Sequence, residues 1–470
     1  MTFNDIVRPK WLVGLLLAVV VVMPMCLFGI AQGAAIAVSM ALACVVPLVL
    51  ARRCSWWSLA STVAYCAVAL FSVVSAIYFL YEVSVGSGAT LEMPNLDCDA
   101  RLYYDWALHY YDGRRPEPYV TFFGFPVLMI LMWKALGVSV VWPSAFNLML
   151  MLGAVAMSGS LAAHITRSTA MKPTTAATMA ISLMGLHGFF LSQGFVIQKE
   201  AIVYIAVTMV AMSLFRLQDA SASRRKTVAS VALYVGACLI FAPVRAKYIN
   251  FALFGVGLLA ISCWRTRWRS IVVMLVMTVA TWYLGMMLST TYNIKQQMET
   301  MAGGAEMTES FGMVEGIHLD YLNWMGGYFS LPLFKKLLLL PFTCGTQFVI
   351  PFPWGAEDDS WGAWMPRIRL GWYLCGVLAL CYYGMLSWRR RYSVGLVAWW
   401  PVICFVGIAY ISAGTVSRYI LPFQPLYTAV AVYVIACFRI PELRRPLLRA
   451  FVGIEVLLAV ALVVAFIICT

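Results

Sequence analysis

Residues 57–81, WSLASTVAYCAVALFSVVSAIYFLY, contain no charged side chain and no regular alternation of apolar and polar positions. A helix of this length crosses the roughly 30 Å hydrocarbon core of a bilayer, whereas the strands of a membrane barrel are shorter and alternate. Similar runs recur along the chain, which is 63% hydrophobic and 11% charged, with a mean hydropathy of +0.85. A soluble domain has about 45–50% apolar and about 25% charged residues. The sequence therefore predicts an all-α, polytopic protein of the lipid bilayer, whose backbone amides pair within helices.

Short clusters of Lys and Arg lie between the apolar runs and predict which ends share a side of the membrane. Arg8 and Lys10 precede the first run, residues 11–31, which we interpret as a span because it is long and lacks a small-residue cleavage site. The formal net charge of +13 follows from these clusters, so we expect no nucleic-acid partner. Length and sidedness predict about thirteen spans: residues 11–31, 34–50, 57–81, 140–164, 174–196, 201–216, 227–242, 248–263, 270–289, 367–386, 393–412, 418–437 and 450–469.

Two broken apolar segments are predicted not to cross the membrane. Residues 119–136 contain Gly124, Pro126 and Lys134, which is typical of a helix lying flat at the interface. Residues 331–354 are interrupted by prolines, a glycine and two lysines, which favours a re-entrant or interfacial segment. The chain then divides into N-terminal transmembrane helices (1–81), a first outer loop with an interfacial helix (82–139), a transmembrane core (140–289), a second outer loop with a re-entrant segment (290–366) and C-terminal transmembrane helices (367–470).

The predicted outer side carries a polar and aromatic island, MPNLDCDARLYYDWALHYYDGRRPEP, at residues 93–118. Asp99 and Tyr103 are four residues apart, so a helix places them on one face, and Asp97 and Asp105 are close to them in sequence. Paired carboxylates serve as a general base for an acceptor hydroxyl or bind a divalent cation, and both roles stay open. We therefore take these three aspartates as candidate catalytic residues; a solvated loop whose carboxylates pair with arginines is the alternative.

Several cations at the predicted outer ends of spans run against the positive-inside pattern. A cation in that position requires a partner, and a lipid-linked phosphate is one that Lys and Arg bind well, whereas contact with ordinary headgroups is the alternative. Glu200 lies next to one of these cations and can neutralise it, and His318 in the second outer loop is near Glu315 and Asp320. The candidate phosphate-binding cations are Lys199, Arg245, Lys247 and Arg418, and the other candidate substrate-binding residues are Tyr103, Glu200, His318 and Tyr419.

The order of these features resembles the GT-C superfamily of membrane glycosyltransferases. The stretch DCDARLYYDWA is followed by the interfacial segment PEPYVTFFGFPVLMILMWKALG and by a span that opens VSVVWPSAFNLML. The late stretch SRYILPFQPLY, which contains Arg418 and Tyr419, is similar to an Arg-Tyr-x-x-Pro stretch of many such proteins. Protein mannosyltransferases and aminoarabinose transferases belong to this superfamily. The resemblance extends from about residue 57 to residue 440 and rests on loose motifs.

The resemblance implies transfer of a sugar from a polyprenyl-phosphate-linked donor to a glycan, lipid or protein acceptor, in cell-envelope polysaccharide or glycolipid synthesis. It implies a bacterial inner membrane, with the active site on the outer face. Asp99 would be the catalytic base on the match D-x-x-x-Y, with Asp97 as the near alternative, and Lys199, Arg245 and Arg418 would hold the donor phosphate. The chain departs from the family where an adjacent Asp-Glu pair becomes Asp-Cys-Asp and where two extra spans precede the loop.

Other functions stay open at this point. An O-antigen-type polysaccharide polymerase is also polytopic and binds a lipid diphosphate, but its main polar loop is expected late in the chain. A multi-span transporter is expected to bind its substrate near the bilayer midplane, with broken helices in two repeated halves. A membrane acyltransferase needs a deep histidine, and His187 has no acidic neighbour in sequence, so we interpret it as a buried core residue.

Overall fold

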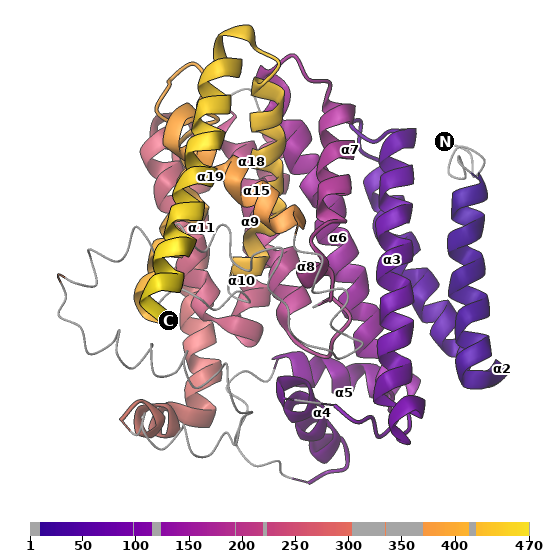
Figure 1. Ribbon diagram of the computed structural model, residues 1–470. Helices are drawn as coiled ribbons and strands as arrows, with labels where there is room; N and C mark the ends of the chain where they lie inside the picture. The colour runs from indigo at the N-terminus through magenta and orange to yellow at the C-terminus, as the bar shows by residue number, and fades with distance from the viewer. Residues whose placement is uncertain are drawn as a thin grey trace.

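The computed structural model describes most of the chain as helix and, in the residues it describes, contains no strand (Figure 1). The described residues are 10–96, 98–114, 124–192, 194–219, 223–302, 334, 370–412 and 420–469. Among these residues, six helices are long and apolar enough to cross a membrane, and four shorter apolar helices accompany them. The prediction of an all-α protein of the lipid bilayer is therefore confirmed.

The helices follow the apolar runs of the sequence closely. Their bounds are α2 Lys10–Arg52, α3 Leu59–Val83, α4 Cys98–Tyr111, α5 Gly124–Leu136, α6 Val141–Ile165, α7 Pro173–Met184, α8 Gly188–Ser192, α9 Glu200–Gln218, α10 Arg224–Arg245, α11 Lys247–Ala302, α15 Leu370–Cys381, α16 Trp400–Ser412, α18 Gln424–Cys437 and α19 Pro441–Cys469.

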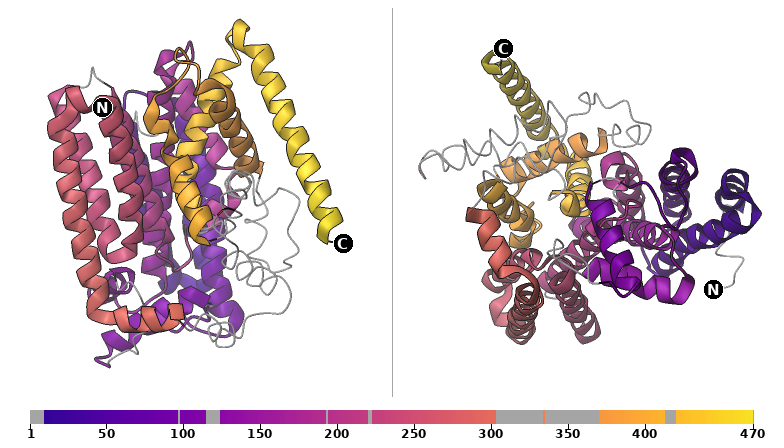
Figure 2. Two further views of the ribbon diagram at one scale, coloured as in Figure 1. Left: turned by 90° about the vertical axis from the view of Figure 1, so that its left-hand side faces the viewer. Right: turned by 90° about the horizontal axis from the view of Figure 1, so that it is seen from below.

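Two of the longest helical segments reverse direction. In α2 the backbone at Gly29 has a φ of 79°, and a Cβ at Gly33 would lie 2.6 Å from Met25 Cα, so the chain folds back on itself there. In α11 a Cβ at Gly285 would lie 2.8 Å from Ala246 Cβ. A straight helix would separate these two residues by roughly 58 Å. Each of the two segments is therefore a pair of antiparallel arms, as the predicted pairs of spans require (Figure 2).

The two ends of the bundle differ in charge. At one end, called the basic end here, Arg167 lies 3.8 Å from Asp219, and Arg267 donates to the Asp219 carbonyl oxygen at 2.9 Å. Arg52 ends α2 and Arg224 begins α10 at the same end, at the top of Figure 1. The opposite end, called the loop end, holds α4, α5, the first residues of α9 and the junction of α10 with α11.

Three elements differ in detail from the prediction. The polar island contains a regular helix, α4, which the sequence interpretation left undecided between helix and loop. The predicted span at residues 174–196 is broken into α7 and α8, followed by irregular backbone at residues 194–199. Helix α11 continues to Ala302, past the predicted span end at residue 289, and its last part lies across the loop end (Figure 2). The predicted re-entrant segment at residues 331–354 lies outside the described residues, apart from residue 334.

The interfacial helix α5 is seated on the end of α10 through a glycine. A Cβ at Gly124 would lie 2.7 Å from the Pro243 carbonyl oxygen, so only a residue without a side chain allows this approach. Phe125 follows and is fully buried. The contact fixes α5, and through it α4, against the part of the bundle that holds Arg245.

We expect Gly124→Ala to lower the free energy of unfolding by about 1–3 kcal/mol, because the added methyl group forces α5 away from α10. The matched control is Gly257→Ala in α11, where an added Cβ meets nothing within 4 Å. This control is expected to be neutral or stabilising by up to about 1 kcal/mol. The unfolding transitions of both variants in detergent micelles are compared with that of the wild type. Equal effects of the two substitutions would contradict the packing argument.

Candidate functional site

Three elements that are distant in sequence bring polar side chains together at the loop end. Tyr103 comes from α4, Lys199 and Glu200 from the start of α9, and Arg245 from the end of α10. Phe125 of α5 packs against the Tyr103 ring. These five residues are called the loop-end cluster here. All four of its polar members are among the substrate-binding residues that the sequence predicts.

A buried ion pair forms the inner part of the loop-end cluster. Arg245 Nη1 donates to Glu200 Oε1 at 3.1 Å, and the two side chains are only 9% and 2% exposed. Glu200 is the first residue of α9 and Arg245 is the last residue of α10, so each charge lies at the helix end whose dipole favours it. The Arg245 guanidinium also lies 5.5 Å from the centre of the Tyr248 ring.

Lys199 connects the ion pair to the polar island. Its ammonium group donates a hydrogen bond to the Tyr103 hydroxyl and lies 5.0 Å from the centre of that ring. The Tyr103 ring meets Phe125 edge-to-face, with ring centres 5.9 Å apart. Lys199 therefore holds α4 and α5 against the start of α9. Among the described side chains of the cluster, the charges of Lys199, Glu200 and Arg245 sum to one positive charge.

The irregular backbone before Lys199 is held in place by α6. Ser144 Oγ donates to the Phe195 carbonyl oxygen at 2.7 Å. Asn147 Nδ2 donates to the carbonyl oxygens of Val196 and Gln198, both at 2.8 Å. Backbone that is not helical requires such partners inside a membrane bundle. Sequence reasoning missed Ser144 and Asn147, although two polar residues three apart in an apolar run were the available signal.

Most aromatic rings of the polar island pack α4 onto its neighbours. Tyr104 donates to the Glu92 carbonyl oxygen at 2.8 Å, and its ring lies 4.9 Å from that of Trp133 in α5. Burial of Tyr104 raises the pKa of its hydroxyl, so the ring stays neutral at physiological pH. Trp106 is buried and stacks on the exposed ring of Tyr110, with ring centres 5.6 Å apart. Contacts within the protein therefore account for the burial of Tyr104 and Trp106.

The candidate catalytic carboxylates are placed differently from one another. Asp99 lies in the first turn of α4, one turn before Tyr103, so its backbone is on the face that packs on Lys199. The side chain of Asp99 and all of Asp97 lie outside the described residues. Asp105 pairs with Arg101 at 3.4 Å, and both side chains are exposed, at 54% and 70%. The structure therefore places Asp105 on the solvent-facing side of α4.

The remaining predicted residues do not join the loop-end cluster in the described structure. Lys247 is exposed at the first residue of α11. His318, Arg418 and Tyr419 lie outside the described residues, so their substrate-binding roles stay predictions. Within the described part of the chain, no group of three or more His, Cys, Asp or Glu residues could hold a metal ion. A divalent cation therefore stays a prediction that depends on Asp97 and Asp99.

His187 is buried, as predicted. Its Nε2 lies 3.3 Å from the Thr428 hydroxyl, and Nδ1 has no hydrogen-bond partner among the described residues. Among the described residues no carboxylate hydrogen-bonds to the His187 ring. His187 therefore forms no acid–base pair there that would support the acyltransferase alternative.

Comparison with known proteins identifies no relative: no family model matches the chain, and no curated protein or solved structure matches it either. The resemblance to GT-C glycosyltransferases therefore stays a hypothesis that rests on the residues themselves.

We expect Glu200→Gln to destabilise the protein by about 3 kcal/mol or more, because it leaves the Arg245 charge buried without a counter-charge. The double variant Glu200→Gln/Arg245→Gln is expected to recover part of the loss, since both buried charges are then removed. Thermal unfolding in detergent measures both effects.

The control for this test is Asp105→Asn, which removes an exposed ion pair and is expected to cost at most about 1 kcal/mol. A Glu200→Gln variant as stable as Asp105→Asn would contradict the role given to the buried pair.

Proposed function

We propose that the protein is a polytopic membrane glycosyltransferase of the GT-C type. It transfers a sugar from a polyprenyl-phosphate-linked donor to an acceptor at the outer face of the membrane. The single observation that carries the proposal is the convergence of Tyr103, Lys199, Glu200 and Arg245 at the loop end. This cluster lies one helical turn from Asp99, the candidate base.

The order of elements supports the proposal. Span α3 leads into α4 and α5 at the loop end, and the chain then returns through α6. This is the order that the resemblance implies: a span, an acidic loop with an interfacial segment, and another span. The proposal keeps thirteen crossings, which would be the two arms each of α2 and α11, the broken α7–α8 segment, and α3, α6, α9, α10, α15, α16, α18 and α19. With the basic end in the cytoplasm, the loop end faces outward.

In the proposed reaction Asp99 acts as the base and Lys199 binds the leaving phosphate. The Asp99 carboxylate takes the proton of the acceptor hydroxyl, and the resulting oxygen attacks the anomeric carbon of the donor sugar. The bond between that carbon and the phosphate oxygen breaks, and polyprenyl phosphate leaves with the bonding electrons. Lys199 stabilises the negative charge that develops on the leaving phosphate. An ammonium group has three N–H donors, and Tyr103 accepts one of them.

Arg245 has a different role in this scheme from the one that the sequence suggested. Because Glu200 neutralises it in a buried pair, Arg245 positions the start of α9 and holds Lys199 at the site. A bare phosphate clamp made of Lys199 and Arg245 would instead require both cations to face the ligand. We therefore assign donor contact to Lys199 and a positioning role to the Glu200–Arg245 pair.

The base is tested with two aspartates of the same helix. Asp99→Asn is expected to lower the transfer rate at least about 100-fold, because general-base catalysis contributes about 10²–10⁴. Asp105→Asn is the matched control and is expected to keep activity near that of the wild type, since Asp105 faces solvent. Transfer is measured with the donor that mass spectrometry identifies as lipid copurifying with the wild-type protein.

A polyprenyl-phospho-sugar enriched on Asp99→Asn supports the proposal and identifies the donor. Activity lost in Asp105→Asn but kept in Asp99→Asn would contradict the assignment of the base. If no polyprenyl lipid copurifies with any variant, the glycosyltransferase proposal itself fails and a transporter becomes the better hypothesis.

The phosphate contact is tested with two lysines that were both predicted to bind the donor. Lys199→Gln is expected to raise the KM for the lipid-linked donor by about 10- to 100-fold, the scale of one charge-assisted hydrogen bond. Lys247→Gln removes the same charge from an exposed position at the start of α11 and is expected to change KM less than threefold. Steady-state kinetics at varied donor concentration give both values. Equal increases in the two variants would indicate a general electrostatic effect instead of a contact at Lys199.

A further inference from the structure

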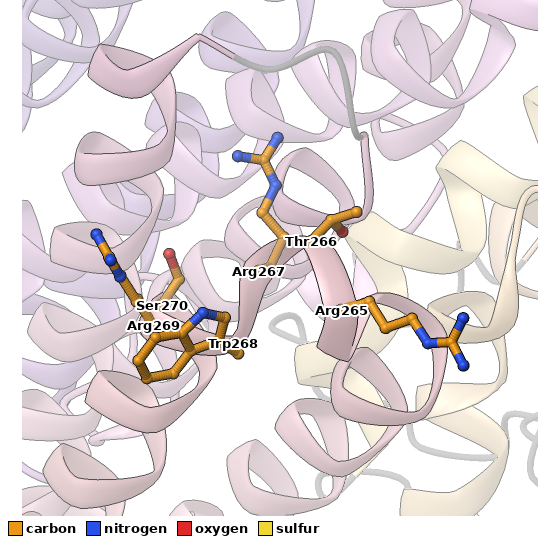
Figure 3. A pocket seen from close by; sticks show the side chains of 6 residues that line it. All are labelled: Arg265, Thr266, Arg267, Trp268, Arg269 and Ser270. Carbon is orange, nitrogen blue, oxygen red and sulfur yellow. The ribbon is translucent and has the colours of Figure 1, made fainter.

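The turn between the two arms of α11 carries three arginines at the basic end. It has the sequence WRTRWRS, residues 264–270, and surrounds a hollow of about 340 Å³ lined by Arg265 to Ser270 (Figure 3). The candidate glycosyltransferase site lies at the opposite end of the bundle and does not use this turn.

One arginine of the turn braces it against the bundle. Arg267 donates to the Thr227 hydroxyl at 3.0 Å and to the Asp219 carbonyl oxygen at 2.9 Å. These contacts tie the turn to the end of α9 and the start of α10. The positions of its neighbours, Arg265 and Arg269, are therefore set by the fold.

The other two arginines face outward. Arg265 and Arg269 are exposed and extend to opposite sides of the turn in Figure 3. The Arg269 guanidinium lies 5.4 Å from the centre of the Trp268 ring. Among the described residues no carboxylate lies within 4 Å of Arg265 or Arg269, and the sequence contains no Asp or Glu from residue 220 to residue 298. No carboxylate of the described part of the chain therefore balances this positive charge.

Apolar surface adjoins the cations on the membrane side. Trp264 and Trp268 are each 49% exposed, and tryptophan is the residue enriched at the boundary between headgroups and acyl chains. Ile261 on one arm and Val276 on the other are among the exposed apolar side chains that continue from the turn toward the membrane interior. The turn thus presents cations, then indole rings, then aliphatic side chains. The phosphate, glycerol and acyl chains of a phospholipid have the same order.

We propose that this turn binds the headgroups of anionic phospholipids of the surrounding bilayer. Because Arg265 and Arg269 extend to opposite sides of the turn, each donates hydrogen bonds from its planar fork of N–H groups to the phosphodiester oxygens of a separate lipid. The indole rings lie at the glycerol level, and the acyl chains follow the aliphatic residues of the two arms. The proposal does not depend on the glycosyltransferase activity, because no residue is shared between the two sites.

The test compares lipid binding by the full chain with binding by charge variants. Purified protein in detergent is titrated with phosphatidylglycerol, phosphatidylcholine or inorganic phosphate, and bound lipid is counted by native mass spectrometry. Wild type is expected to prefer phosphatidylglycerol over phosphatidylcholine. Arg265→Gln/Arg269→Gln is expected to weaken phosphatidylglycerol binding by roughly 10- to 30-fold, the scale of two cations beside anionic headgroups. Arg265→Lys/Arg269→Lys keeps the charge and is expected to lose less.

The matched control is Arg444→Gln/Arg445→Gln, which removes two exposed cations from α19 at the same end of the bundle. An equal loss in this control would overturn the proposal, because binding would then depend on total charge and not on the turn. Equal affinity of the wild type for the two lipids would overturn it as well, and this comparison needs no variant to fold. Competition by inorganic phosphate as strong as by the lipid would indicate a soluble anion as the ligand and would also overturn it.

Discussion

Hydrocarbon offers no hydrogen-bond partner to a backbone amide, and the candidate site depends on how the protein meets this constraint. Residues 194–199 are irregular although they lie between two helices of the bundle. Ser144 and Asn147 of α6 satisfy three of their carbonyl oxygens. These hydrogen bonds hold residues 194–199 against α6. Lys199 and Glu200, at the start of α9, therefore lie beside the polar island. Two uncharged side chains in α6 thus make the charged cluster possible.

The buried ion pair follows from the antiparallel packing of α9 and α10. Successive antiparallel helices bring the start of one beside the end of the next, so Glu200 at the start of α9 meets Arg245 at the end of α10. The two helix dipoles favour these two charges, which offsets part of the desolvation cost of burying them. The pair is neutral as a unit. The net positive charge of the cluster therefore resides on Lys199, at the side that faces Tyr103 and α4.

The sequence predicted the helical scaffold well because apolar length and cation position are local properties. The reversal inside α11 falls between two predicted spans, and the one inside α2 begins at Gly29, two residues before the predicted end of the first span. Tyr103, Lys199, Glu200 and Arg245 come together at the loop end, and their role stays a prediction. The exposed position of Asp105 was not predictable, because it depends on which face of α4 packs on α5. The roles of Ser144 and Asn147 were missed since a polar residue in a span does not reveal which distant carbonyl it satisfies.

With the loop end facing outward, as proposed, the buried cation there and the exposed cations of the α11 turn at the basic end are balanced in different ways. At the loop end the positive-inside rule disfavours a cation, and the fold compensates with a protein carboxylate for Arg245 and a phenol for Lys199. At the basic end cations are favoured, and the fold anchors Arg267 while Arg265 and Arg269 stay exposed. An anionic headgroup balances an exposed arginine at no conformational cost to the protein, whereas a buried one needs a partner built into the fold. The buried Glu200–Arg245 pair therefore marks a place at the loop end where the protein supplies its own counter-charge, as the proposed site requires.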